Sequence, residues 1–160
     1  PKITRAVLAA GNEVGNHSWN HPDFSRIGTS ASVNQVIRTD QAIYAATGKL
    51  PQYMRPPYGN ITAAEGRQIQ HPIIRWSVDS RDWALLNTQK DIQSVLSATR
   101  SGSIVLMHDI HAPSVAAVPT IIKRLKAKGY HFVTVSQLLN QQALPGLQYF
   151  AAGNYRTAGK

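Results

Sequence analysis

Short runs of residues that favour strands alternate along this chain with longer segments of helical periodicity. The strand-like runs lie at residues 13–16, 52–55, 73–78, 103–107 and 130–135, and the fourth is apolar enough for a strand buried on both faces. Apolar residues at helical spacing predict helices at 33–44, 92–99 and 115–125, each followed by a glycine suited to end it. Strands that alternate with helices through short connections are typical of α/β domains, so we expect α/β organisation.

Three further signals define how the chain is organised. Residues 6–10 with Gly11 have the pattern of the last turns of a helix and its C-cap, so we expect further chain upstream. Thr62 to Glu65 has the spacing of a capping box and predicts a short helix that ends before Pro72. Residues 141–160 lack sustained periodicity, so we expect one domain over residues 1–140 and a C-terminal tail over 141–160.

Composition narrows the classes of protein to which the chain can belong. With 160 residues and 42% hydrophobic content, the chain can bury the core of one domain. A net charge of +9 favours an anionic partner such as nucleic acid, a membrane surface or an acidic wall polymer. Basic residues do not interleave with aromatic ones, and no run approaches the roughly 18 apolar residues of a membrane span. Neither nucleic acid binding nor a transmembrane helix is therefore expected.

Chemically versatile residues follow four of the predicted strands. His17 and His21 follow the first strand, residues 55–58 end the second, residues 79–83 follow the third, and His108 follows the fourth. In β/α barrels the carboxyl ends of the strands hold the active site. Four separate segments are therefore expected to meet at one rim, which favours an enzyme.

His17 and His21 are four residues apart, a spacing close to one helical turn. On a helix both imidazoles would lie on one face and could bind one divalent metal ion. The chain has no cysteine, so only His, Asp and Glu are available as strong ligands. A catalytic metal site also needs a third protein ligand, often a carboxylate, and an open position for water. The alternative is a surface helix with two solvated histidines.

Arg55 precedes two prolines that hold the following loop in an extended conformation. A fixed guanidinium at this position could orient a carboxylate, and the backbone N–H of Tyr58 or Gly59 could bind an oxyanion. The alternative is a proline-rich turn with a surface arginine.

Asp79, Asp82 and Trp83 form a second compact segment. A carboxylate of this segment close to His108 would orient its imidazole and favour the protonated form that a general acid needs. Trp83 offers a flat apolar face on which a sugar ring can stack. His111 lies close enough in sequence to compete with His108 for the acid role. The alternative is an Asp-capped turn with a tryptophan in the core.

Taken together, these segments resemble the polysaccharide deacetylase family, also called carbohydrate esterase family 4 or the NodB homology domain. The matching motifs are H-[ST]-x-x-H at 17–21, R-x-P-Y at 55–58, D-x-x-D-W at 79–83 and L-x-H at 106–108. The resemblance covers the chain to about Asn140. Residues 14–19 and 103–111 are most similar to peptidoglycan N-acetylglucosamine deacetylases of Gram-positive bacteria.

The resemblance implies a distorted (β/α)7 barrel that removes the acetyl group from N-acetylglucosamine by metal-assisted hydrolysis. It implies His17 and His21 as metal ligands, with zinc in most relatives and cobalt or nickel as further candidates. It implies His108 as the general acid, Asp82 as its support and Arg55 as the residue that orients the catalytic base. The backbone N–H of Tyr58 would help to bind the oxyanion. Leu106 with Trp83 would line the pocket for the acetyl methyl, and Pro57 is also expected to contact the substrate.

One departure from the family pattern is the absence of its first motif, T-F-D-D-G-[PS], which supplies the base and a third metal ligand. No Asp-Asp pair occurs in the 160 residues. Two N-terminal strands added to the five predicted here would give seven, so we expect an N-terminal fragment of the same enzyme as a partner. The other expected partner is a peptidoglycan strand, in the cell wall or outside the cell of a Gram-positive bacterium. Alternatives are a chitooligosaccharide or acetylxylan deacetylase, or a non-catalytic carbohydrate-binding remnant.

Overall fold

The computed structural model describes residues 1–159 and divides the chain into two units. Unit 1 contains Pro1–Arg75, Thr134–Tyr149 and the segment that starts at Asn154, and unit 2 contains Trp76–Val133 and Phe150–Gly153. Each unit has its own buried apolar cluster. Among the described residues, no helix is both long enough and apolar enough to cross a membrane.

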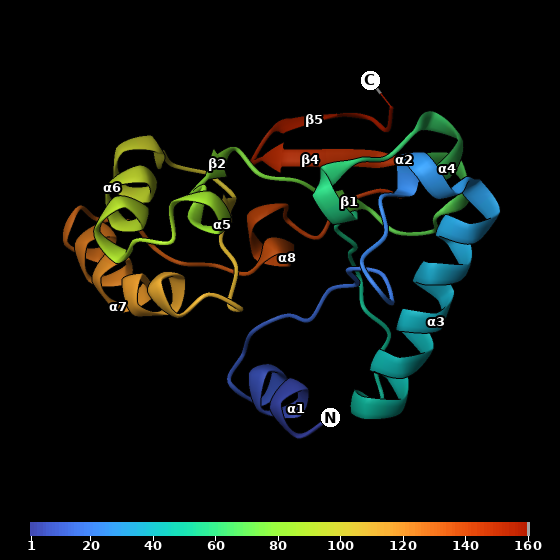
Figure 1. Cartoon of the computed structure of the whole chain (residues 1–160), viewed down its shortest axis with the longest axis horizontal. Coiled ribbons are helices and arrows are strands. Elements are labelled where there is room, and N and C mark those ends of the chain that lie inside the picture. The colour runs from blue at the N-terminus through green and yellow to red at the C-terminus, as the bar shows by residue number, and fades with distance from the viewer. Residues whose placement is uncertain (160) are drawn as a thin grey trace. The chain divides into compact units, whose positions relative to one another are not determined.

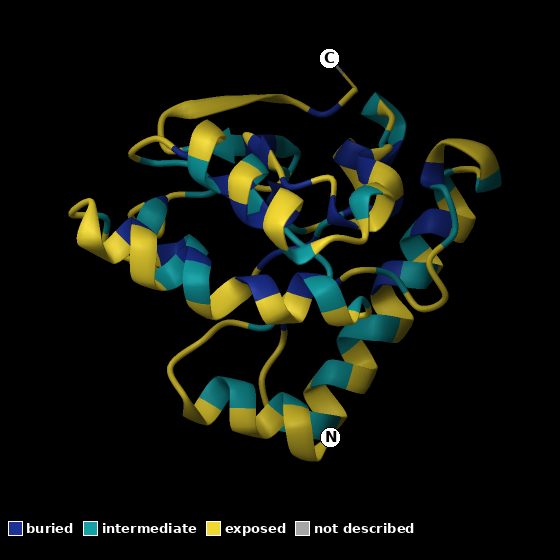
Figure 2. Ribbon diagram, turned by 60° about the vertical axis from the view of Figure 1, so that its left-hand side comes forward, coloured by how far each residue is buried: buried dark blue, intermediate teal, exposed yellow. Residues whose placement is uncertain are grey.

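Unit 1 combines helices with short strands (Figure 1). Its elements are α1 (Lys2–Ala9), α2 (Phe24–Ile27), α3 (Thr29–Thr47), the 3₁₀ turn η1 (Pro57–Gly59), α4 (Ala63–Gln68), β1 (Ile73–Ile74), α8 (Val135–Leu138), most of β4 (Leu147–Ala151) and β5 (Asn154–Thr157). The predicted end of α3 is confirmed at Gly48, which has φ 73°. The predicted start of α4 is confirmed by the capping box that Thr62 forms with Glu65. The predicted N-terminal helix is also confirmed, and it has no buried residue (Figure 2).

Unit 2 contains β2 (Val78–Asp79), α5 (Asp82–Leu85), α6 (Thr88–Ala98), β3 (Val105–Leu106) and α7 (Ala112–Ala127). Helices α6 and α7 pack side by side (Figure 1). Their contact buries one apolar stripe from each helix, made of Ile92, Val95, Ala117, Ile121 and Leu125. The predicted helices at 92–99 and 115–125 are therefore confirmed, and the buried stripes explain their periodicity.

The strands are shorter than the sequence predicts. Asn16 and Met54, within two predicted strands, form only single parallel bridges, Asn16 with Met54 and Met54 with Ile73. The predicted strand 73–78 is divided into β1 and β2, and β2 pairs with β3 in parallel. The predicted strand 130–135 is wrong: a capping box between Thr134 and Gln137 starts helix α8 there instead. Phe132 and Val133 before it are about half exposed, at 51% and 53%.

The last twenty residues contain regular structure that their weak periodicity did not predict. Strand β4 pairs with β1 in parallel, with Ile73 opposite Gln148 and Ile74 opposite Tyr149. Strand β5 lies beside β4 in the same sheet, which has the order β1-β4-β5. The division into a domain over 1–140 and a tail over 141–160 stays a prediction, although part of this tail pairs with β1.

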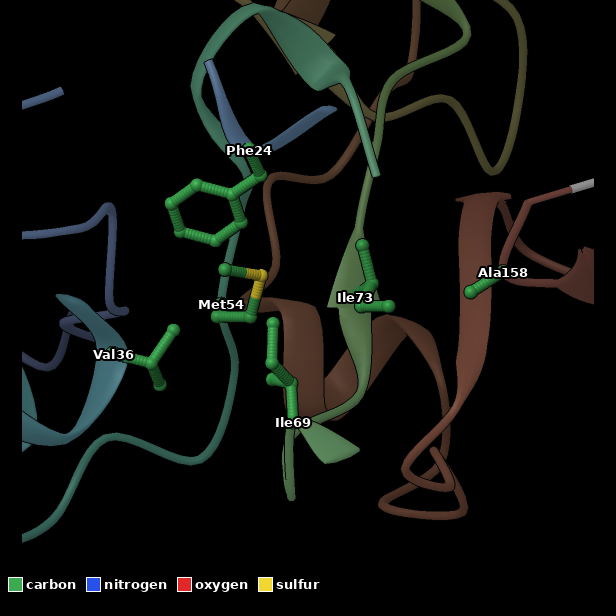
Figure 3. Packing of buried hydrophobic residues seen from close by; sticks show 6 residues of the cluster. All are labelled: Phe24, Val36, Met54, Ile69, Ile73 and Ala158. Carbon is green, nitrogen blue, oxygen red and sulfur yellow. The ribbon is translucent and has the colours of Figure 1, made fainter. Parts of the chain in front are cut away.

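The core of unit 1 joins segments that are far apart in the sequence (Figure 3). It consists of Phe24, Val36, Met54, Ile69, Ile73 and Ala158, each at most 4% exposed. Gly66 of α4 permits the contact with Ala158, because a Cβ at Gly66 would lie 2.1 Å from the Ala158 Cβ. The absence of a side chain at Gly66 therefore allows the C-terminal segment to pack on α4.

Candidate active site

Within unit 1 the two histidines lie on an irregular loop, so the expected helix between them is wrong. Ser18 and His21 have left-handed backbone angles, with φ 68° and 61°. The loop is held by side chains: Asn16 Oδ1 accepts a hydrogen bond from the Ser18 N–H at 2.8 Å, and Ser18 Oγ accepts one from the His21 N–H at 3.0 Å. Gln35 of α3 accepts hydrogen bonds from the N–H groups of Trp19 and Asn20, at 2.9 and 3.2 Å.

The loop nevertheless brings the two exposed imidazoles together. The ring centroids of His17 and His21 are 5.0 Å apart, with an interplanar angle of 73°. Nδ1 of His17 lies 2.6 Å from the carbonyl oxygen of Arg55. Because a carbonyl only accepts, Nδ1 carries the hydrogen and the lone pair of the neutral ring is on Nε2. This tautomer and this type of backbone contact are usual for histidines that bind metals.

A divalent metal therefore fits the histidine pair chemically, with His17 in the correct tautomer and His21 beside it. Among residues 1–159, no group of three or more His, Cys, Asp or Glu side chains is arranged to hold a metal ion. Within this part of the chain the pair thus offers two ligands, and a third would have to come from elsewhere.

Arg55 and the loop that follows it lie beside the histidines. The Arg55 guanidinium donates from Nε to the Ile74 carbonyl at 3.1 Å and from Nη2 to the Arg75 carbonyl at 3.2 Å, at the end of β1. Burial, followed by the positive charge of Arg75, lowers the pKa of Arg55. The observed contacts fix this side chain against the strand end. Its role in orienting a catalytic base stays a prediction.

The structure distinguishes the two N–H groups proposed for oxyanion binding. The Gly59 N–H donates to the Pro56 carbonyl at 3.0 Å, so the turn itself uses it. Tyr58 has a left-handed backbone with φ 57°, and no hydrogen bond within the described residues uses its N–H. The Tyr58 ring is exposed and lies 4.8 Å from the His21 ring, centroid to centroid. These contacts favour Tyr58 over Gly59.

Within unit 2, Asp82 and His108 form a tightly held pair. Asp82 is fully buried, and its Oδ1 lies 2.8 Å from Nδ1 of His108. The other oxygen, Oδ2, accepts a hydrogen bond from the His108 backbone N–H at 2.7 Å. One carboxylate therefore fixes both the backbone and the ring of His108, and as an acceptor it places a hydrogen on Nδ1. Asp82 contacts His108 and not His111, whose ring centroid lies 6.5 Å from that of His108.

Several hydrogen bonds keep Asp82 ionised despite its burial. Burial alone would raise its pKa, but hydrogen bonds from the ring and backbone of His108 outweigh this, and the pKa falls to about 2. Ser80 contributes an O–H bond to Asp82 Oδ1 at 2.9 Å. Ser114 also lowers the pKa, although its hydroxyl oxygen has no partner at hydrogen-bonding distance and angle. Asp82 is therefore negatively charged at neutral pH and lies behind His108.

The residues expected to contact substrate differ in exposure. Trp83 is 55% exposed, and its backbone N–H donates to Asp82 Oδ1 at 3.0 Å, so this tryptophan is not a core residue. Leu106 is buried in β3, and Pro57 is buried in η1 of unit 1. Asp79 is exposed and accepts a hydrogen bond from the Arg81 N–H at 2.9 Å. It forms an Asp-capped turn, and Asp82 alone provides the carboxylate for His108.

Asn16 is a positioning residue that the sequence analysis missed. It is 1% exposed, and its side-chain nitrogen donates to Val36 O at 2.9 Å and Asp40 Oδ1 at 2.7 Å. Its side-chain oxygen accepts the hydrogen bond from the Ser18 N–H. Asp40 also binds the ring of His71 at 2.8 Å. The available signal was an amide at the end of the predicted strand 13–16, immediately before a histidine.

The comparisons with known proteins agree with these motifs. The family model described as polysaccharide deacetylase matches residues 1–71. The chain is 40% identical over 150 residues to the peptidoglycan-N-acetylglucosamine deacetylase PgdA of Listeria monocytogenes. The aligned region covers 94% of this chain and 32% of the relative. The chain thus spans about a third of the length of the first curated relatives it matches.

Two solved structures are also similar. The peptidoglycan deacetylase PdaC from Bacillus subtilis has a TM-score of 0.84 and 38% identity, covering 86% of this chain and 68% of that one. A family 4 acetyl xylan esterase from Clostridium thermocellum, in complex with a cobalt ion, has a TM-score of 0.83 and 26% identity, covering 90% and 72%. The chain belongs to the polysaccharide deacetylase family. The predicted fold class, part of a (β/α)7 barrel, is confirmed by this likeness.

Proposed function

We propose that this chain forms part of a metal-dependent hydrolase that removes the N-acetyl group from N-acetylglucosamine residues of peptidoglycan. The observation that carries the proposal is the double hydrogen bond between buried Asp82 and His108. A carboxylate that fixes both the ring and the backbone of a histidine is a typical arrangement for an acid or base of defined orientation. The peptidoglycan substrate is supported by the names of PgdA and PdaC.

His17 and His21 are proposed as two protein ligands of one divalent metal, with zinc first and cobalt or nickel as alternatives. The tautomer of His17 supports this role, as does the cobalt ion in the acetyl xylan esterase. When bound, such a metal would polarise the amide carbonyl and lower the pKa of a bound water. The chain has no Asp-Asp pair, so we propose that a further N-terminal segment supplies the third ligand and the base.

The residues of this chain then have distinct tasks. As the acetamide C–N bond breaks, the leaving nitrogen takes the proton from Nε2 of His108, while Nδ1 remains bound to Asp82. Arg55 would orient the base, and the Tyr58 N–H would donate to the oxygen that becomes negative at the carbonyl. Leu106 with Trp83 would line the pocket for the acetyl methyl, the exposed face of Trp83 could also stack on the sugar, and Pro57 would contact the substrate. A peptidoglycan substrate implies a location in the cell wall or outside the cell.

Acetate release tests this function directly. The chain is assayed with zinc, alone and together with a polypeptide that carries the missing Asp-Asp motif, on peptidoglycan, chitin oligomers and acetylxylan. We expect release from peptidoglycan by the two pieces together and its loss on adding a chelator. Preferential acetate release from chitin oligomers or acetylxylan would show that this polymer is the substrate, while the deacetylation reaction stays as proposed. No release from any of the three polymers would overturn the proposal.

His108 and His111 provide a matched pair of variants for this assay. His108→Asn removes the proposed proton donor, so kcat should fall by about 10²- to 10⁴-fold. His111→Asn removes a neighbouring imidazole that does not contact Asp82, so kcat should change by a few-fold at most. Equal losses in the two variants would contradict the assignment of His108 as the acid.

A non-catalytic carbohydrate-binding role is the second candidate. The observation that favours it is the absence of an Asp-Asp pair from the sequence. Calorimetry with N-acetylglucosamine oligomers would support this role if it showed binding while acetate release stayed absent in the presence of the Asp-Asp polypeptide. Turnover under the same conditions would exclude it.

A further inference from the structure

Asp91 is a buried carboxyl group that the proposed chemistry does not use. It lies in the first turn of α6 and is fully buried. Among the described residues, neither of its oxygens has a hydrogen-bond partner. An ionised carboxylate in this condition is very costly, because burial removes its hydration and no donor replaces it. A protonated carboxyl is much less costly to bury.

The surroundings of Asp91 connect it with the Asp82–His108 pair. The N-terminal turns of α6 and α7 meet where the Thr88 hydroxyl donates to the Pro113 carbonyl at 3.1 Å. Ser114, one residue further along α7, is also buried and its hydroxyl oxygen also has no partner within the described residues. Two buried polar side chains from the adjoining helix ends thus lack a hydrogen-bond partner within the described residues. Helix α5, which begins at Asp82, packs against α6, and the charge of Asp82 acts on Asp91.

The surroundings of Asp91 and Asp82 shift the pKa values of the two carboxyl groups in opposite directions. Burial, and then the negative charge of Asp82, raises the pKa of Asp91, while His111 at the start of α7 lowers it less. Asp82 has a pKa of about 2 because donors surround it. The other ionisable groups on elements packed against α6 are all exposed, namely Asp79 of β2 and Lys123, Arg124 and Lys126 of α7. Burial without a donor favours the neutral form of Asp91, whereas the donors around Asp82 favour its ionised form.

We propose that Asp91 is a positioning residue that carries a proton at neutral pH and so leaves Asp82 as the single buried negative charge behind His108. A second charge at Asp91 would repel Asp82 and compete for the hydrogen bonds that hold the imidazole. Asp91 therefore acts on His108 through Asp82 and does not contact substrate. Its importance for catalysis rests on the proposed acid role of His108, but its protonation state does not.

Nuclear magnetic resonance of the whole chain tests this inference without an activity assay. Labelling with carbon-13 and nitrogen-15 reports the protonation state of each carboxyl group, and through-bond correlations to the backbone assign the Asp91 signal in the unmodified chain. We expect the Asp91 carboxyl carbon to show the protonated form at neutral pH, with the signal of exposed Asp109 as the comparison. An ionised Asp91 at neutral pH would overturn the proposal even if the variant failed to fold.

The ring nitrogens of His108 provide the second readout. Asp91→Asn keeps a neutral group of similar shape, so the nitrogen shifts of His108 at neutral pH should match those of the unmodified chain. Only the part of the change in these shifts that follows the Asp91 carboxyl signal as pH rises is attributed to Asp91. This part should appear in the unmodified chain and in the Asp109→Asn control, but not in Asp91→Asn. The same alkaline change in Asp91→Asn, or altered shifts at neutral pH, would show that Asp91 does not position His108 in this way. Loss of acetate release with normal shifts would instead indicate failure of the proposed function.

Discussion

The lowered pKa of the buried Asp82 carboxylate should have a measurable effect on the free energy of unfolding. Its pKa is about 2 in the folded chain and about 3.9 in an unfolded one. A depressed folded pKa stabilises the protein above the unfolded value, and this contribution is lost as pH falls from about 4 to about 2. We expect Asp82 to contribute about 2 kcal/mol to the free energy of unfolding at neutral pH. The measurement is urea unfolding as a function of pH.

Asp82→Asn and Asp109→Asn separate this effect from general acid sensitivity. The first variant should be less stable at neutral pH and should lose part of the change between about pH 4 and pH 2. Asp109 is exposed, so its variant should keep the full dependence. Equal acid dependence in Asp82→Asn and the unmodified chain would show that the carboxylate is not stabilised by its hydrogen bonds.

The histidine pair predicts a metal affinity that depends on both imidazoles. Removing either His17 or His21 should weaken zinc binding to the chain by at least about tenfold, because each change removes one of two protein ligands. Exposed His131 supplies a control, since His131→Ala leaves the pair intact. Calorimetric titration with zinc measures the affinities. Unchanged affinity in both His17→Ala and His21→Ala would exclude the pair as ligands.

Among the elements, α4 and the C-terminal segment are coupled through one close contact. A Cβ at Gly66 would lie 2.1 Å from the Cβ of Ala158, so Gly66→Ala should reduce the free energy of unfolding by about 1–3 kcal/mol. The double variant Gly66→Ala/Ala158→Gly frees the space and should regain most of the loss. Denaturant unfolding of the four members of this cycle measures the coupling. Purely additive effects would mean that the two residues do not touch.

Elements that depend on periodic apolar packing could be predicted from the sequence, whereas a loop that depends on particular side-chain hydrogen bonds could not. Helices α6 and α7 were predictable because their apolar stripes repeat within each helix. The loop from His17 to His21 was not, because Asn16 and Gln35 impose left-handed angles through side-chain hydrogen bonds that no periodicity records. The site motifs identified the Asp82–His108 pair, but their spacing did not indicate which of His108 and His111 the carboxylate contacts.

For the molecule as a whole, the excess of 17 Lys and Arg over 8 Asp and Glu predicts binding to anionic wall material that weakens with salt. The Debye length falls from about 10 Å at about 0.1 M salt to about 3 Å at about 1 M, so long-range attraction is screened. Cosedimentation with isolated cell walls should show bound chain falling steeply over this salt range. Walls stripped of their anionic polymers should bind less at low salt. Binding that depends neither on salt nor on those polymers would mean that the net charge has no part in wall association, and that the sugar contacts alone hold the chain.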